Sequence, residues 1–551
     1  MEQQSHTGAA IIGAKLKQAG CKHAFGIPGG EVLAILEGLD QAGIKFHLTK
    51  HENAAGFMAE GAWHAEPAGS RAPAILVATI GPGVANAVNV IANAMQDRVP
   101  MIFLTGCVET SEGETYTHQV FDHQAMLRPI VKASFRASEG TVGVMMEKAL
   151  AIAFDGQPGP VHVDVPIGVA ENVSNETLQP LMALPAHGTA EGTPAFSQAV
   201  EALLNAERPL VIAGVDAVNE GASDIVTQFC NETGIALVTS YKGKGLLDEN
   251  SVLSLGGHGL SPKSDRTILP LIKQADCILL MGYDPIEMRT GWRNPWGDEA
   301  IVIDIAPSLR THGMHRTNIT LAGNCTANLS AMLSAVADQL DKKKGDWQSW
   351  TETTVREAHQ SLADQFDMPN DWGPGQVFGT LNACLPADVV ITADSGAHRI
   401  LLSQMWTSAT AHTFLQSSAL CTMGCAVPLA AGYKVANPET PVCAFVGDAG
   451  LEMGLGELAT LRDMEQPILI CVLVDESLAL IELKQRNTQR KNLGVDFGAT
   501  DFPAVAKALG GHGVLIEDQK TLQAEAKDAL QRNTFTVLAC KINRRAYDGT
   551  F

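Results

Sequence analysis

The sequence has no excess of positive charge, no long apolar run and no C-x-x-C pair. Its 551 residues carry a formal net charge of −21, which argues against nucleic acid or an anionic membrane surface as a partner. No apolar run reaches the length of a membrane-spanning helix, and the polar start MEQQSHTGAA lacks the regions of a signal peptide. We therefore expect a cytoplasmic protein that binds neither nucleic acid nor membrane.

The cysteines do not have the spacing of a zinc site or of a disulfide framework. Their number, 11, is odd, and Cys421 and Cys425 form a C-x3-C without a matching His/Cys cluster. Cys443 and Cys471 lie in apolar runs and are expected to be small core residues. Reduced thiols fit a location in the cytosol.

What the chain does have is length, apolar residues and a repeated alternation of strand-like and helix-like segments. Hydrophobic residues make up 46% and charged residues 18%, so a large buried core is expected. The length suffices for about three or four domains. The alternation predicts an α/β fold of three consecutive doubly wound parallel-sheet domains, over residues 1–180, 190–340 and 360–551. A stretch at 180–194 rich in Pro, Ala, Gly and Thr is expected to be a linker.

Two acidic residues follow two apolar runs in the last of these domains. The run PVCAFV leads into Gly447-Asp448-Ala449-Gly450, a helix is expected over LEMGLGELATLRDM, and the run PILICVLV ends on Asp475. Such acids would meet at the carboxyl ends of neighbouring parallel strands. Carboxylates and phosphate oxygens are the ligands that Mg2+ prefers, and glycines let backbone N–H groups approach phosphate. An ordinary β-turn would explain the GDAG run by itself equally well.

The surroundings of GDAG resemble the cofactor motif of thiamine-diphosphate (ThDP) enzymes, which is GDG followed after roughly two dozen residues by Asn-Asn. Here the 24 residues 450–473 separate GDA from Val474-Asp475. Ala449 replaces the second Gly, and Val474-Asp475 replaces Asn-Asn, which keeps an oxygen ligand and adds negative charge. The resemblance implies that Asp448, Asp475 and the Ser477 carbonyl hold Mg2+. It also implies that Gly447, Ala449 and Gly450 lie at the cofactor.

Four segments of the first domain resemble, in order and spacing, the N-terminal domain of acetolactate synthase and its relatives. They are FGIPGGEVL, KHENAAGFMAEGAW, ATIGPGVANAV and VPMIFLTG. By itself, Glu52 could be a helix N-terminal acid favoured by the macrodipole. The resemblance implies instead that Glu52 hydrogen-bonds N1′ of the cofactor's aminopyrimidine, with Pro28 and Asn86 nearby.

The segment ETYTHQVFDHQAMLRPIVKASFR contains two further candidates. Aligned with the family's RPITK-like run, Gln119 falls on a Gln that lines the acetolactate synthase active site, and His118 replaces an apolar aromatic residue. This His-Gln pair resembles the carboxyethylarginine synthase branch, or in function the His-bearing decarboxylases. We expect catalytic roles for His118 and Gln119. His118 and His123 could instead be loop histidines without a part in catalysis.

Three more sets of residues follow from the resemblance in the last domain. Gly396, Ala397 and His398 fall where the family's GQH-like run binds diphosphate. The run SSALCTMGCAVPLAAG places Met423 on the apolar residue that bends the cofactor, and the Cys421 carbonyl on the acceptor for its 4′-amino group. The substrate-pocket candidates in ALIELKQ are Leu480, Ile481 and Lys484. Met423 could also be simple core packing, and Lys484 could be only solvated.

The middle domain has four strand candidates and no G-x-G-x-x-G motif. The equivalent acetolactate synthase domain holds FAD, and GGHGLSPKSDR partly resembles its GMHG loop. We expect a structural domain and do not favour FAD.

The resemblance implies a ThDP- and Mg2+-dependent enzyme that forms a ThDP-enamine from a small 2-oxo acid by decarboxylation. The enamine is then released as an aldehyde or ligated to a second carbonyl. The alternatives are an acetolactate-synthase-type carboligase, a ThDP-dependent diketone-cleaving hydrolase and a non-catalytic FAD-binding homologue. In this family the half-site with Glu52 and the half-site with Asp448 come from different subunits, which implies a homodimer or homotetramer.

Overall fold

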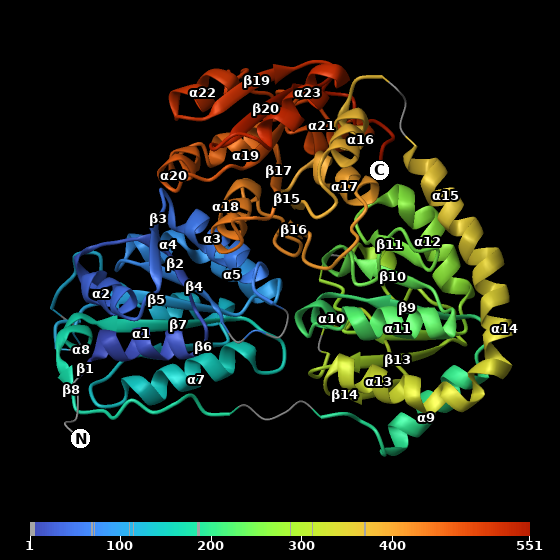
Figure 1. Ribbon diagram of the computed structural model, residues 1–551, viewed down its shortest axis with the longest axis horizontal. Coiled ribbons are helices and arrows are strands. Elements are labelled where there is room, and N and C mark those ends of the chain that lie inside the picture. The colour runs from blue at the N-terminus through green and yellow to red at the C-terminus, as the bar shows by residue number, and fades with distance from the viewer. Residues whose placement is uncertain are drawn as a thin grey trace.

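Three six-stranded parallel sheets form the framework of the protein (Figure 1). The computed structural model describes residues 6–67, 70, 72–109, 111–113, 115–183, 188–286, 288–310, 312–367 and 371–551. Residues 184–187 of the expected linker and Glu114 of the expected active-site loop lie outside this range. Helices cover both faces of each sheet, and the prediction of three doubly wound α/β domains is confirmed.

The first sheet has the strand order β3-β2-β4-β5-β7-β6. Its strands are β2 (His23–Ile27), β3 (Lys45–Leu48), β4 (Ala74–Ala78), β5 (Met101–Cys107), β6 (Ala133–Arg136) and β7 (Pro160–Pro166). Its helices are α1 (Gly8–Gln18), α2 (Leu33–Gln41), α3 (Glu52–His64), α4 (Pro82–Asn86), α5 (Val88–Gln96), α6 (His123–Leu127), α7 (Val142–Phe154) and α8 (Ile167–Glu171). A small antiparallel ribbon pairs β1 (His6–Thr7) with β8 (Val173–Ser174).

The second sheet has the order β11-β10-β9-β12-β13-β14. Its strands are β9 (Pro209–Ala213), β10 (Leu237–Ser240), β11 (Ser254–His258), β12 (Cys277–Met281), β13 (Ile301–Ala306) and β14 (Ile319–Ala322). Its helices are α9 (Pro194–Asn205), α10 (Val215–Asn219), α11 (Ser223–Thr233), α12 (Pro262–Gln274) and α13 (Cys325–Val336). Helices α14 (Leu340–Trp350) and α15 (Arg356–Phe366) then run along the outer side of this domain towards the last one (Figure 1).

The third sheet has the order β16-β15-β17-β18-β20-β19. Its strands are β15 (Val390–Ala393), β16 (Phe414–Gln416), β17 (Val442–Gly447), β18 (Leu469–Val474), β19 (His512–Ile516) and β20 (Thr536–Lys541). Its helices are α16 (Pro374–Cys384), α17 (Ala397–Met405), α18 (Ala426–Ala436), α19 (Asp448–Met453), α20 (Glu457–Asp463), α21 (Ala479–Asn487), α22 (Phe502–Ala508) and α23 (Gln519–Ala529). The apolar runs of β17 and β18 are buried on both faces, as central parallel strands are.

Helices α3 and α18 join the first and third domains, and glycines allow their close approach (Figure 1). A Cβ on Gly61 would lie 2.1 Å from the Leu429 carbonyl oxygen, and a Cβ on Gly432 would lie 1.8 Å from that of Met58. Any side chain at either position would push the helices apart. This contact fixes the first domain against the third.

One helix that the sequence predicts as continuous is interrupted. The helix expected over 451–464 is divided into α19 and α20 at Gly454–Gly456. Glycine is a poor residue in a helix interior, which explains the break. No helix among the described residues is long and apolar enough to cross a bilayer.

Candidate cofactor site

Asp448 and Asp475 lie at the ends of the adjacent parallel strands β17 and β18, as the sequence predicts. The Asp448 carboxylate accepts hydrogen bonds from three backbone N–H groups: Ala449 at 2.8 Å, Asp475 at 3.0 Å and Glu476 at 2.7 Å. The Ser477 N–H donates to Asp475 Oδ1 at 3.1 Å. The turn is tight, because Glu476 has a φ of 57°, a left-handed conformation that is uncommon outside glycine. These bonds hold two carboxylates and the Ser477 backbone in one place.

This arrangement brings two buried carboxylates close together. Burial and the neighbouring Asp448 charge together raise the pKa of Asp475 to about 8, and burial raises the pKa of Asp448. The buried Ser477 hydroxyl oxygen has no hydrogen-bond partner. A hard divalent cation would relieve the repulsion between the two acids and would accept oxygen ligands of this kind. The residues therefore fit Mg2+ together with a diphosphate.

Asp394 organises the same half-site, although the sequence analysis did not single it out. It is fully buried, and its carboxylate accepts the N–H of Gly424 at 2.7 Å, the N–H of Gly447 at 3.3 Å and His398 Nε2 at 2.9 Å. It therefore joins the loop after Met423, the GDAG turn and the start of α17. Asp394 follows β15 as Asp448 follows β17. An acidic residue directly after an apolar strand was therefore the sequence signal that could have identified Asp394.

Ala397 and Gly396 lie at the beginning of α17, next to the His398 ring. A Cβ on Gly396 would lie 2.5 Å from His398 Nδ1, and a Cβ on Gly447 would lie 3.4 Å from His398 Cε1. A Cβ on Gly450 would meet Asp394 Oδ2 at 2.0 Å. These glycines allow the His398 and Asp394 side chains to pack directly against the backbone.

The other half-site is built around Glu52, at the first position of α3. The His51 ring caps this helix by accepting the Asn53 N–H at 3.1 Å. Glu52 is only 5% exposed, and its Oε2 accepts a hydrogen bond from Asn86 Nδ2 at 3.0 Å. Asn86 itself is exposed on α4, and Pro28 is exposed after β2. The Glu52 carboxylate thus faces a surface of the first domain that a second protein surface could cover.

Gln119 lies next to this half-site. It has a φ of 60°, and a Cβ on Gly81 would lie 2.4 Å from its carbonyl oxygen. A Cβ on Gly83, two residues further along, would lie 3.4 Å from Glu52 Oε1. The chain therefore places the backbone of Gln119 close to the turn that packs on Glu52. His118 and the Gln119 side chain are exposed there.

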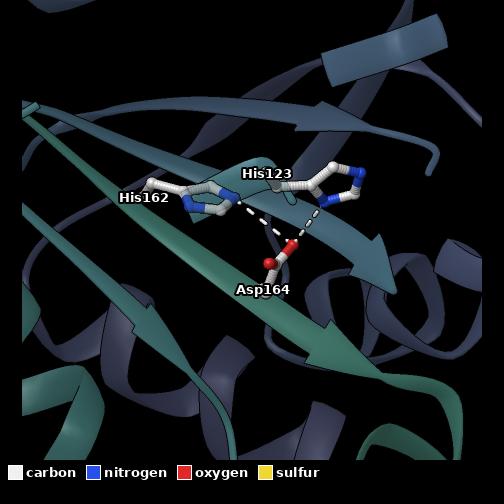
Figure 2. Close-up of side chains that lie close together, drawn as sticks. All are labelled: His123, His162 and Asp164. Carbon is white, nitrogen blue, oxygen red and sulfur yellow. Dashed lines mark hydrogen bonds and ion pairs between the residues drawn. The ribbon is translucent and has the colours of Figure 1, made fainter. Parts of the chain in front are cut away.

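His123 is buried and contacts this turn, and Figure 2 shows its ring beside Asp164. Its Nδ1 contacts Asp164 Oδ1 at 2.8 Å, and its Nε2 accepts the Gly81 N–H at 3.2 Å. His162 lies on the same face of β7 as Asp164, and its Nε2 is 3.4 Å from Asp164 Oδ1. Burial disfavours the Asp164 charge, but the hydrogen bonds from His123 and His162 outweigh it and hold the pKa of Asp164 well below its usual range.

These three side chains are close enough together to suggest a metal centre, but the hydrogen bonds argue against one. Because His123 Nε2 accepts the Gly81 N–H, the proton of a neutral ring lies on Nδ1. A protonated Nδ1 donates to Asp164 and is not a metal ligand. The cluster is therefore a hydrogen-bonded support for the Gly81 turn.

We expect His123→Leu to lower both stability and turnover, because it leaves the Gly81 N–H and Asp164 without their partner. Each unpaired buried group costs about 1–3 kcal/mol, and displacement of the turn would lower kcat by roughly 10- to 100-fold. His162→Leu is the matched control, since it also removes a bond to Asp164 but does not touch Gly81. Thermal unfolding and kcat should show that both variants lose stability and that only His123→Leu loses turnover. Equal losses of kcat would contradict this role.

A cavity of about 620 Å³ lies between the first and third domains. Met423 and Cys421 line one side, and His51, Asn53 and Ala54 line the other. Cys421 has a φ of 56°, so the backbone at its carbonyl is held in an uncommon conformation. Glu52 itself is not among the lining residues, although its neighbours His51 and Asn53 are.

The substrate-pocket candidates on α21 differ from one another. Ile481 and Lys484 are exposed, whereas Leu480 packs against the core of the third domain. The structure therefore leaves Ile481 and Lys484 accessible next to the Asp475 turn and turns Leu480 towards the interior.

In the middle domain, a dinucleotide would bind such a sheet in the crevice between β9 and β12. A Cβ on Gly282 there would lie only 2.3 Å from the Ala217 nitrogen. Asp216 and Asp284 occupy this position. They pair with Arg310 at 2.7 Å and Arg98 at 2.8 Å. A diphosphate would face these carboxylates and compete with them for the two arginines.

Comparison with known proteins identifies the family. Residues 6–126 match the model "Thiamine pyrophosphate enzyme, N-terminal TPP binding domain", residues 196–332 match its central domain and residues 394–540 its C-terminal TPP binding domain. The chain belongs to the thiamine pyrophosphate enzyme family. Thiamine pyrophosphate is ThDP, and the three matches coincide with the three sheets, in the same order. This chain is accordingly an enzyme of the ThDP-dependent class.

The curated relatives of this ThDP enzyme are acetolactate synthases. It is 28% identical to acetolactate synthase isozyme 1 large subunit of Escherichia coli, over 96% of this chain and 92% of the relative. It is 26% identical to the acetolactate synthase of Bacillus subtilis, over 95% and 91% of the two chains. It is 25% identical to the catabolic acetolactate synthase of Raoultella terrigena, over 99% and 96%. The similarity extends over the whole framework.

Proposed function

We propose that the protein is an acetolactate-synthase-type carboligase that uses ThDP and Mg2+. It would decarboxylate a small 2-oxo acid and join the remaining acyl carbon to the carbonyl carbon of a second molecule. The observation that carries this proposal is the end-to-end similarity to acetolactate synthases together with the acids Glu52, Asp448 and Asp475 at the positions of the family's motifs. Ligation therefore takes precedence over the aldehyde-releasing reaction. Such similarity and the intact acids also argue against a non-catalytic homologue.

The bound ThDP would supply the electron sink for loss of CO2. Asp448, Asp475 and the Ser477 carbonyl would hold Mg2+ and with it the diphosphate, next to Gly396, Ala397 and His398. Glu52 would hold a proton at N1′ of the aminopyrimidine, and Asn86 would orient the Glu52 carboxylate through its 3.0 Å hydrogen bond. Met423 and the Cys421 carbonyl would fix the pyrimidine, and Gln119 would contact the substrate. We assign these roles within domains over residues 1–180, 190–340 and 360–551.

We propose that the active protein is a homodimer or a homotetramer in which a second chain completes the site. Glu52 does not line the cavity that contains Met423. Large apolar side chains near both half-sites are exposed in the single chain: Tyr116, Phe121, Met126, Met453 and Ile481. A second copy that places its Asp448 half-site over the first chain's Glu52 would cover them. Several relatives are named as large subunits. The assembly would therefore also be searched for a second, different kind of subunit.

We further propose that the enzyme works without FAD and in the cytoplasm. The Asp216–Arg310 and Asp284–Arg98 pairs occupy the dinucleotide position and connect the middle domain to the first. All 11 cysteines are free thiols, in keeping with a reducing compartment.

A decarboxylase that releases an aldehyde is the second candidate, and His118 is the residue that favours it. His118 is exposed next to Gln119, where it could donate a proton. If it does, His118→Phe should cut aldehyde release by about 10²–10⁴-fold and reduce CO2 loss much less. Product would shift towards ligation with added aldehyde or 2-oxo acid. Measured product ratios equal to those of the wild type would remove His118 from the proton-donor role.

The function is tested by incubating the protein with ThDP, Mg2+ and a panel of small 2-oxo acids, alone and in pairs. CO2 and the organic products are both quantified. The proposal expects one ligated hydroxyketo acid for each CO2 released, and no dependence on added FAD. Aldehyde in equal amount to CO2 would favour the second candidate, and cleavage of a diketone without CO2 would indicate a hydrolase.

A further inference from the structure

A buried cluster of charges lies where the three domains meet. Lys242 comes from the middle domain just after β10, Asp97 from the end of α5, and Glu60 from α3. Lys242 Nζ lies 2.9 Å from Asp97 Oδ2 and 3.9 Å from Glu60 Oε1. The Asp97 and Glu60 side chains are fully buried, and that of Lys242 is 7% exposed. None of these three residues is part of the cofactor site described above.

Asp97 holds the backbone of the loop that carries Cys421 and Met423. Its Oδ2 accepts the Ser418 N–H and its Oδ1 accepts the Ala419 N–H, both at 2.9 Å. The loop needs such support, because the left-handed Cys421 conformation is unfavourable by itself. The charge of Asp97 therefore fixes the chain immediately before the carbonyl and side chain proposed to hold the pyrimidine.

A second path connects the cluster to the same loop. Asn93 Nδ2 donates to Glu60 Oε2 at 3.0 Å, and Asn93 Oδ1 accepts from the Ser417 hydroxyl at 2.6 Å. The Ser417 hydroxyl in turn accepts the Thr422 N–H at 3.0 Å. The loop 417–424 is thus held at Thr422 as well as at Ser418 and Ala419.

The surroundings of Glu60 and Asp97 indicate which of these two carboxyl groups depends on the positive charge of Lys242. Burial raises the pKa of the Glu60 carboxyl above its usual range, which favours its neutral form. Asp97 makes two hydrogen bonds to the loop and the shorter contact with Lys242. A buried carboxylate that loses its cationic partner is strongly destabilised. Asp97 without Lys242 would therefore move, and it would then release one of its two backbone N–H partners.

We infer that Lys242 is a positioning residue through which the middle domain sets the cofactor-binding loop 417–424. It touches neither the reacting atoms nor the metal acids. It neutralises Asp97, and Asp97 holds Ser418 and Ala419 in the arrangement that presents Cys421 and Met423. The middle domain thereby contributes to cofactor binding through Lys242 and Asp97. This inference rests on the proposed role of the Cys421–Met423 loop in binding ThDP.

The test compares Lys242→Met with Lys244→Met. Lys244 lies in the same segment, is similarly buried and pairs with Glu249 of its own domain at 2.8 Å, so it controls for loss of a buried ion pair. Three quantities are measured: hydrogen exchange of residues 417–424 without cofactor, ThDP affinity by calorimetry, and kcat. Lys242→Arg, which retains the charge, tests for rescue.

We expect Lys242→Met to speed exchange of the loop, to weaken ThDP binding by about 10- to 100-fold and to lower kcat by roughly 10²-fold. Lys244→Met should leave the loop and ThDP affinity within about threefold of the wild type, which is less than 1 kcal/mol. Lys242→Arg should restore most of the affinity.

Unchanged loop exchange in folded Lys242→Met, or equal loosening in Lys244→Met, would overturn the inference. If Lys242→Met does not fold, the same measurements are made on Asp97→Asn. Asn retains the shape of the Asp97 side chain and removes the charge that Lys242 neutralises. Asp97→Asn with wild-type loop exchange would overturn the inference. The loop measurement needs no ThDP, so a wild-type protein that fails to bind ThDP would contradict the proposed function and not this role of Lys242.

Discussion

Glu52→Gln is expected to leave ThDP bound and to lower turnover by about 10²–10⁴-fold, the usual effect of removing an essential proton relay. The amide of Gln can still contact Asn86, so the change removes the acid and keeps the shape. Exchange of the cofactor's C2 proton with solvent, followed by NMR, should slow by a similar factor.

Glu31→Gln is the matched control for this experiment. Glu31 is a partly buried acid of the same domain, and its Oε2 accepts a 2.7 Å hydrogen bond from the Thr79 hydroxyl. The Glu31→Gln variant should retain wild-type proton exchange and turnover within about threefold, which corresponds to less than 1 kcal/mol in the activation barrier. Wild-type proton exchange in Glu52→Gln would refute the role of Glu52.

Asp448→Ala should abolish Mg2+-dependent binding of ThDP. The Asp448 carboxylate holds the N–H groups of Ala449, Asp475 and Glu476, so its loss removes a metal ligand and also releases the turn that carries Asp475. Because loss of an outer-shell partner already costs about 10–100-fold in metal affinity, calorimetry should show ThDP binding more than about 10²-fold weaker.

Asp501→Ala provides the control for Asp448→Ala. Asp501 belongs to the same domain and caps α22 by accepting the Ala504 N–H at 3.0 Å. Loss of such a cap costs roughly 1 kcal/mol of stability and should leave ThDP affinity unchanged. If Asp448→Ala binds ThDP with wild-type affinity in the presence of Mg2+, Asp448 does not hold the metal.

The fold and the strand-end acids were predictable because they depend on local patterns. Alternating apolar runs and helix-like segments predicted the three parallel sheets, and the apolar runs before Asp448 and Asp475 predicted adjacent parallel strands. The helix break at Gly454 was missed, because small residues are compatible with a continuous helix unless tertiary packing interrupts it. The sequence pattern also did not reveal that Leu480 faces the core while Ile481 faces solvent.

The supporting residues could not be predicted in the same way, because their partners are distant in the sequence. Lys242 and Asp97 meet only when the middle domain lies against the first, and Ser418 reaches Asp97 from a third domain. Asp394 had a recognisable strand-end position, yet its three partners come from separate loops. The proposed contact between Glu52 and the Met423 loop involves a second chain, so neither one sequence nor one folded chain contains it.

In the proposed assembly, one catalytic site takes Glu52 from one chain and Asp448 from another. Coexpression of Glu52→Gln with Asp448→Ala chains, each with its own tag, tests it directly. Every mixed dimer would then contain one site with both changes and one unaltered site. Random pairing of the two chains in a symmetric dimer should restore roughly a quarter of wild-type turnover, although each variant by itself is nearly inactive. Purified mixed dimers with no more turnover than the two separate variants would contradict the claim.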